Sequence, residues 1–173
     1  ARNERKAVVA YIVRYGADTN VAATDHGHAG TSQDDEIMAP ALQSLATNGM
    51  TPGAAMGLAF GGRREYLPQI RDALRAQAVS PDAVAYVVAL RWLNDADPTS
   101  VDAIRNLLSN NDLAYHAVNA LFENGSHQAL EALMAHAEMR RDASVTYHLL
   151  GYPQTRERAL RLFGDLLGSP GPG

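Results

Sequence analysis

The chain has 173 residues, of which 46% are hydrophobic, a net charge of −4 and no cysteine. This length and apolar content fit one globular domain, and the lack of an apolar run of about 20 residues predicts a soluble chain with no membrane partner. Without cysteine there is no disulfide, thiolate nucleophile or zinc–thiolate site, and without a basic block we expect no nucleic-acid partner.

The two ends of the sequence look like internal positions of a longer protein. Residue 1 is Ala rather than Met, no apolar leader follows it, and the Ser-Pro-Gly-Pro-Gly ending cannot continue a helix. We therefore expect a larger parent protein, with residues 169–173 as a linker or an artificial boundary.

Almost all basic residues of the chain are arginines, since it has 14 arginines and a single lysine, Lys6. Two origins are open. The first is a GC-rich bacterial genome, whose codons favour arginine, and in that case we expect a cytoplasmic protein. The second is selection against lysine in a bacterial effector that is secreted into host cytosol, where exposed lysines are ubiquitin acceptors.

Capping residues and glycines mark the expected helix ends. Thr51-Pro52, Ser80-Pro81 and Asp97-Pro98 each place a capping side chain before a proline suited to the first helical position. Further N-cap candidates are Asp112, Asp142 and Thr155, and helices are expected to end near Gly16, Gly49, Gly61, Gly125, Gly151 and Gly168.

Between these marks the apolar residues follow helical spacing and nowhere alternate as in a strand. We expect about ten helices and no sheet, an all-α chain. In chain order, the marking residues are Val9, Ile12 and Val13; Met38, Ala41, Leu42 and Leu45; Leu67, Ile70 and Leu74; Val84, Val87, Val88 and Trp92; Val101, Ile104 and Leu108; Ala114, Ala117, Val118, Leu121 and Phe122; Leu130, Leu133, Met134 and Ala137; Leu160, Phe163 and Leu167.

Second-helix positions recur about every 30 residues, at Ile70, Ile104, Leu133 and Phe163, which is the size of a helix-turn-helix repeat. Each pair needs the next to cover its apolar face, so the pairs should stack as an α-solenoid. We predict one domain over residues 1–168. It has a first pair at 3–49 with a loop at 17–33, and repeats at about 51–78, 80–110, 112–139 and 142–168.

Three stretches resemble parts of the ankyrin repeat: Tyr-Ile-Val-Arg-Tyr-Gly-Ala-Asp-Thr-Asn at 11–20, Asn-Gly-Ser-His-Gln-Ala-Leu-Glu-Ala-Leu at 124–133, and Asn-Gly-Met-Thr-Pro at 48–52. Gly53 replaces the usual apolar residue, and Gly62 is out of register. The later pairs lack finger-like hairpins and are more similar to HEAT repeats. The resemblance implies stacked helix pairs that bind protein along a concave surface or exposed turns, and it implies no reaction.

The segment 17–33 holds the candidate metal ligands Asp25, His26 and His28, followed by acidic residues 34–36. Imidazole and carboxylate groups at this spacing suit zinc or manganese. The alternative is a polar loop that leads into an acidic helix start, where the helix dipole favours negative charge. We predict no cofactor and no catalytic residue.

Candidate protein-binding residues are the turn arginines Arg63 and Arg64 with Tyr66, and the tyrosines Tyr115 and Tyr152. Solvated turn residues are the better explanation of the arginines, and core packing explains the tyrosines at least as well. His148 is expected to be a packed or capping histidine, and the sequence assigns no role to His116, His127 or His136.

The sequence favours a non-catalytic module of a larger bacterial protein that binds another protein, including the case of a host-directed effector. Two alternatives stay open: a metal-dependent hydrolase or accessory domain that uses residues 25–36, and a cysteine-free helical ubiquitin-ligase module. The oligomeric state is open as well.

Overall fold

The computed structural model describes residues 2–15, 35–77 and 80–168. In these ranges the chain is all-α, as expected, with ten α-helices, one short 3₁₀ helix and no strand. The elements are α1 (Arg2–Tyr15), α3 (Asp35–Asn48), α4 (Pro52–Phe60), η1 (Arg64–Tyr66), α5 (Leu67–Ala76), α6 (Ala83–Trp92), α7 (Pro98–Leu107), α8 (Asn111–Asn124), α9 (His127–Arg140), α10 (Ala143–Leu149) and α11 (Arg156–Gly168). None of the described helices is both long and apolar enough to cross a bilayer.

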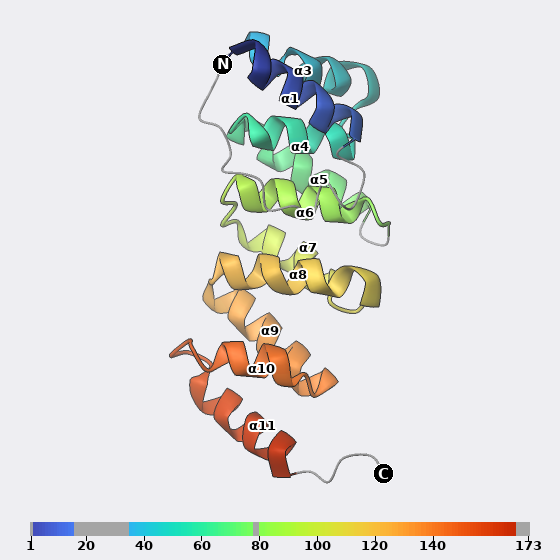
Figure 1. Ribbon diagram of the computed structural model, residues 1–173. Helices are drawn as coiled ribbons and strands as arrows, with labels where there is room; N and C mark the ends of the chain where they lie inside the picture. The colour runs from blue at the N-terminus through green and yellow to red at the C-terminus, as the bar shows by residue number, and fades with distance from the viewer. Residues whose placement is uncertain (1, 16–34, 78–79, 169–173) are drawn as a thin grey trace.

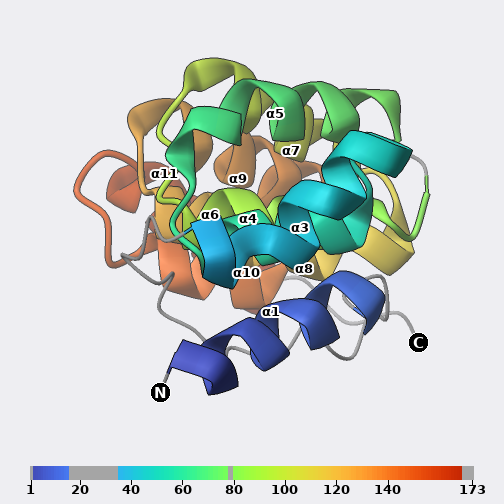
Figure 2. The same ribbon diagram turned by 90° about the horizontal axis from the view of Figure 1, so that it is seen from above.

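The helices stack in chain order, with α1 and α11 at opposite ends (Figure 1). Helices α4, α6, α8 and α10 form one layer, and α5, α7, α9 and α11 form a second layer beside it (Figure 2). Each closely packed pair joins helices that are adjacent or next but one among the described helices. The stacked arrangement therefore agrees with the predicted architecture.

The first two described helices depart from this two-layer pattern, because α1 and α3 both pack on α4 and on each other. Gly53 and Gly57 permit this approach. A Cβ atom on Gly53 would lie 2.0 Å from the Val13 carbonyl oxygen, and one on Gly57 would lie 3.0 Å from the Cβ of Ala41. The absence of a side chain at Gly53 thus provides the space in which α1 lies.

Helix α6 lies at the centre of the core, and its residues from Ala83 to Leu90 are all buried. It packs on α4, α5 and α8. The fully buried Tyr86 donates a hydrogen bond from its hydroxyl to the carbonyl oxygen of Met50 at 2.9 Å. Burial, with a smaller contribution from Asp82, raises the pKa of Tyr86 to about 12, so this group stays a neutral donor.

Three of the predicted N-caps are confirmed. The side chains of Thr51, Asp97 and Asp142 accept hydrogen bonds from the amides of Ala54, Thr99 and Val145, respectively. Each therefore satisfies one of the amides that a helix start leaves without a partner.

Two other predicted starts need correction, and the start at Thr155 is right. Helix α6 begins at Ala83 rather than beside Ser80, whose Oγ accepts from the Asp82 amide in a preceding turn. Helix α8 is capped by Asn110 and not by Asp112. The buried Thr155 does precede α11, but its hydroxyl donates to the Leu149 carbonyl oxygen at 3.0 Å.

The buried face of α11 also differs from the predicted one. Ala159 and Leu162 are buried, whereas Leu160 and Leu167 are exposed, the latter by 75%. Both sets have helical spacing, and α11 packs on α10 and on α9. The stripe at 160, 163 and 167 lies at the end of the described stack, where Phe163 contacts Tyr147 at a ring distance of 6.3 Å.

Candidate functional site

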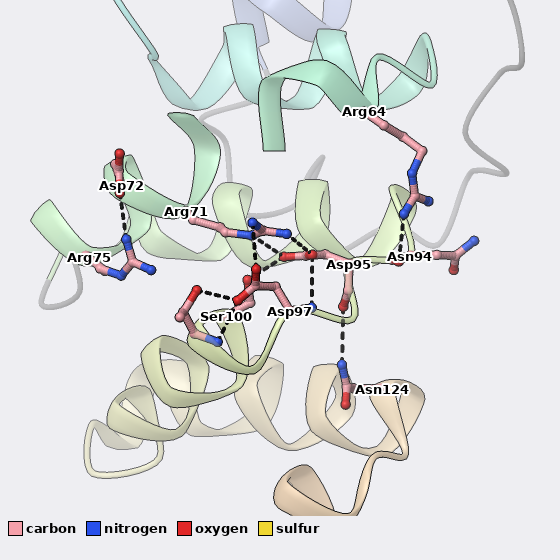
Figure 3. A network of polar contacts seen from close by, with 10 residues as sticks. Arg64, Arg71, Asp72, Arg75, Asn94, Asp95, Asp97, Ser100 and Asn124 are labelled. Carbon is pink, nitrogen blue, oxygen red and sulfur yellow. Dashed lines mark hydrogen bonds and ion pairs between the residues drawn. The ribbon is translucent and has the colours of Figure 1, made fainter. Parts of the chain in front are cut away.

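The predicted turn residues lie between α4 and α5, where they join neighbouring helix pairs. Arg63 donates from Nε to Glu65 Oε1 at 2.6 Å. Arg64 donates to the carbonyl oxygens of Leu93 and, at 3.4 Å, Asn94 in the loop after α6 (Figure 3). Tyr66 is half-buried against the core. These contacts give Arg64 and Tyr66 a role in packing.

The same loop carries a polar network centred on Asp95 (Figure 3). Arg71 of α5 binds both oxygens of this carboxylate, with 2.9 Å between Nε and Oδ2, and Ser100 of α7 donates its hydroxyl to it. The backbone carbonyl of Asp95 accepts from Asn124 Nδ2 at 3.2 Å. One loop residue thereby connects α5, α7 and the end of α8.

Together, the hydrogen bonds and the ion pair lower the pKa of Asp95 more than its burial raises it. Burial alone would raise the pKa of Asp95, but hydrogen bonds from Arg71, Ser100 and the Asp97 amide hold the pKa of Asp95 below its ordinary value. The Asp95 side chain is only 2% exposed and that of Arg71 17%. The described partners come from α5, α7 and α8, so the network joins neighbouring helices.

Acidification should weaken the fold through Asp95. The pKa of Asp95 is depressed only in the folded chain, so its carboxylate stabilises the fold above about pH 4, and this stabilisation is lost as the pH falls through the folded-state pKa. Urea unfolding of the wild type and of Asp95→Asn at about pH 7 and about pH 3 measures this effect. We expect the difference between their free energies of unfolding to shrink at the lower pH. A difference that is the same at both values would contradict the assignment.

A groove of about 730 Å³ lies between α8 and α10, which pack less closely than α4 and α6 or α6 and α8. The predicted binding residues Tyr115 and Tyr152 both line it, whereas Arg63, Arg64 and Tyr66 do not. Its volume is in the range of pockets that hold small ligands or peptide side chains. The structure therefore brings together two of the five predicted binding residues.

Aromatic rings form much of the groove wall. The ring of Phe122, on α8, stacks on Tyr152 with centroids 6.0 Å apart and an interplanar angle of 23°. The His148 ring, on α10, lies 5.7 Å from the same phenyl ring. Tyr115 stands exposed on the α8 side. Flat, partly exposed rings of this kind suit planar or cationic side chains.

Two histidines contribute polar atoms to the groove. His148 Nδ1 lies 2.9 Å from the Ser144 carbonyl oxygen. A carbonyl only accepts, so Nδ1 carries the hydrogen and Nε2 is an acceptor in the neutral ring. His136, from α9, is 7% exposed, and its buried Nδ1 has no partner among the described residues. Burial lowers the pKa of His136, Asp142 opposes this and Arg140 adds to it, which favours a neutral imidazole.

The charged residues that line the groove are acidic. They are Glu123 and Asp142, and no lysine or arginine is among the described lining residues. Arg91, outside the groove, pairs with Glu123 through two nitrogens. Asp142 uses Oδ1 to accept from the Val145 amide at 3.0 Å, while its Oδ2 has no hydrogen-bond partner in the described part of the chain. The groove thus presents acceptors and little positive charge.

The predicted metal ligands Asp25, His26 and His28 lie outside the described residues. Within residues 2–15, 35–77 and 80–168, no group of three His, Asp or Glu side chains is placed to hold a metal ion. The described part of the acidic stretch, from Asp35, begins α3.

Sequence reasoning did not assign Phe122, His136 or His148 to a binding surface. A signal was present in α8, where Tyr115, Val118 and Phe122 recur at spacings of three and four and so share a helix face. No local signal connects this face to a histidine on α9 or α10.

Comparison of the chain with protein-family models, with curated proteins and with solved structures finds no match.

Proposed function

We propose that this chain is a non-catalytic interaction module that binds a peptide segment of another protein in the groove between α8 and α10. The observation that carries the proposal is the groove itself, with an aromatic wall and a buried histidine whose Nδ1 has no hydrogen-bond partner among the described residues. Buried polar groups in folded proteins nearly always have partners, and aromatic side chains in concave sites are typical anchors of protein interfaces.

The fold supports this proposal through its architecture. Stacked helix pairs present long surfaces on which each pair adds a few contacts, and proteins of this kind commonly bind other macromolecules. We also propose that the stack belongs to the ankyrin-like or HEAT-like class of helical repeats. The bacterial origin, the host-directed role and the cellular compartment stay predictions from the lysine-poor composition.

Selection from a random-peptide library tests the proposed function. Peptides enriched on the wild-type chain are measured by fluorescence anisotropy against Ala114→Trp, which fills the groove from α8, and against Ala135→Trp. Ala114 lines the groove, whereas Ala135 is exposed on α9 and does not. We expect Ala114→Trp to weaken binding by about tenfold or more and Ala135→Trp to leave it unchanged.

Two outcomes would reject the proposal. The first is a library without any peptide that binds above background. The second is a set of peptides whose affinity is the same for the wild type and for Ala114→Trp, because such peptides bind elsewhere. Circular dichroism and thermal unfolding of both variants show whether the helices are intact.

A further inference from the structure

The groove between α8 and α10 is lined by His148 and Asp142, which offer acceptor atoms, beside hydroxyl and amide groups that can donate. In the neutral ring of His148, Nε2 is an acceptor because Nδ1 donates to the Ser144 carbonyl oxygen, and Asp142 Oδ2 is a carboxylate oxygen without a partner among the described residues. His136, whose buried Nδ1 has no partner in the described part of the chain, lines the same space. A ligand that brings donors would pair with the acceptor atoms of His148 and Asp142, whereas one that brings only acceptors would leave these two atoms without a partner.

Charge and shape limit the ligand further. Arg91 already pairs with Glu123, which leaves Asp142 as the lining carboxylate that pairs with no basic side chain among the described residues. The described lining itself contains no basic side chain, so a cation is attracted to Asp142 and an anion is disfavoured. The exposed ring of Tyr115 and the stacked rings of Phe122 and Tyr152 offer flat π-faces. A cation held over such faces gains from the ring quadrupole.

Resting on the proposed function, we propose that the groove binds a segment of a partner protein by taking up an arginine side chain between the aromatic wall and Asp142. Guanidinium is planar, is weakly hydrated and carries five donors, so it stacks on rings while donating sideways to a carboxylate and an imidazole. A lysine ammonium is compact and strongly hydrated, and it matches the flat wall less well. Apolar neighbours of the arginine would contact Val118 and Val145, which also line the groove.

Defined peptides test this choice of ligand. The probe is the N-acetylated, C-amidated peptide Leu-Ala-Arg-Ala-Leu, compared with versions that carry citrulline, lysine or glutamate in place of arginine. Citrulline keeps the length and planarity of arginine but loses the charge. NMR shifts of the His136 and His148 rings and of Val118 and Val145 report binding at the groove. We expect saturable shifts with the arginine peptide, affinity about tenfold weaker with citrulline, intermediate affinity with lysine and none with glutamate.

A matched pair of variants tests whether the peptide binds in the groove. Asn119→Arg puts a guanidinium of the chain itself into the groove, because Asn119 lines it from α8. Asn106→Arg adds the same charge on the exposed surface of α7. We expect Asn119→Arg to abolish the shifts and Asn106→Arg to leave the affinity within about twofold, since exposed charges at a distance are screened.

Equal affinity for the arginine and citrulline peptides would overturn the inference while leaving the proposed function intact, because a peptide would still bind the groove. Binding that survives Asn119→Arg, or no saturable shift with any of the four peptides, would overturn it too. The proposed function fails separately, when the random library yields no groove-dependent peptide.

Discussion

Arg71→Ala should lower the free energy of unfolding by about 3 kcal/mol, because it leaves the buried Asp95 carboxylate without its cation. Arg71 binds both oxygens of Asp95 and also reaches Asp97, with 3.0 Å between Nη1 and Oδ2. After the substitution, the Ser100 hydroxyl and the Asp97 amide would be the remaining donors to the carboxylate. Urea unfolding near neutral pH measures the change.

Arg75→Ala is the matched control, since Arg75 lies one turn further along α5 and pairs with Asp72 on the surface. That pair is 45% and 74% exposed, and its loss should cost less than about 0.5 kcal/mol. The double variant Arg71→Ala/Asp95→Ala should lose less free energy of unfolding than the two single variants lose together, because it removes the unpaired buried charge. Equal losses for Arg71→Ala and Arg75→Ala would show that the Asp95 network does not stabilise the stack.

Gly53→Ala should destabilise the chain by about 1–3 kcal/mol by forcing α1 away from α4. The added Cβ would lie 2.0 Å from the Val13 carbonyl oxygen, and a backbone atom cannot move aside as the end of a flexible side chain can. Chemical unfolding measures the stability. Hydrogen exchange of the α1 amides, around Val9 and Val13, shows whether the loss arises at this contact.

Gly164→Ala is the opposite case within the same chain. A Cβ on Gly164 in α11 meets no other atom within 4 Å, so this substitution should raise stability by about 0.5–1 kcal/mol through helix propensity and a less flexible unfolded chain. If Gly53→Ala gave the same increase with α1 still protected from exchange, then α1 would not be packed on α4 as described.

Much of the fold could be predicted because its signals are local. A capping side chain, a proline at the first helical position and a helical apolar period each lie within a few residues, as at Thr51-Pro52 and Asp97-Pro98. The predicted helix starts are less accurate where the local sequence allows more than one capping position. Ser80 caps a turn before α6 rather than the helix itself, and Asn110 takes the capping position two residues before Asp112.

The features that depend on distances between helices could not be predicted. Asp95 is 24 residues from Arg71, and nothing in the sequence of its loop distinguishes it from an ordinary connection between two helices. The groove exists because α8 and α10 stand apart while α9 brings His136 between them. In α11 the sequence has two apolar stripes of equal period, and Ala159 and Leu162 are buried in the packing of α11 with α9 and α10.

The packing of each described helix on its near neighbours also determines how the chain should fold. Contacts between helices close in sequence need only short loops to close, so the entropic barrier to each step is small and folding should be fast for a chain of this length. The buried helix α6, which packs on α4, α5 and α8, is the natural nucleus. Folding would then spread outward toward both ends, and α1 and α11 would be the first helices to open under mild denaturation.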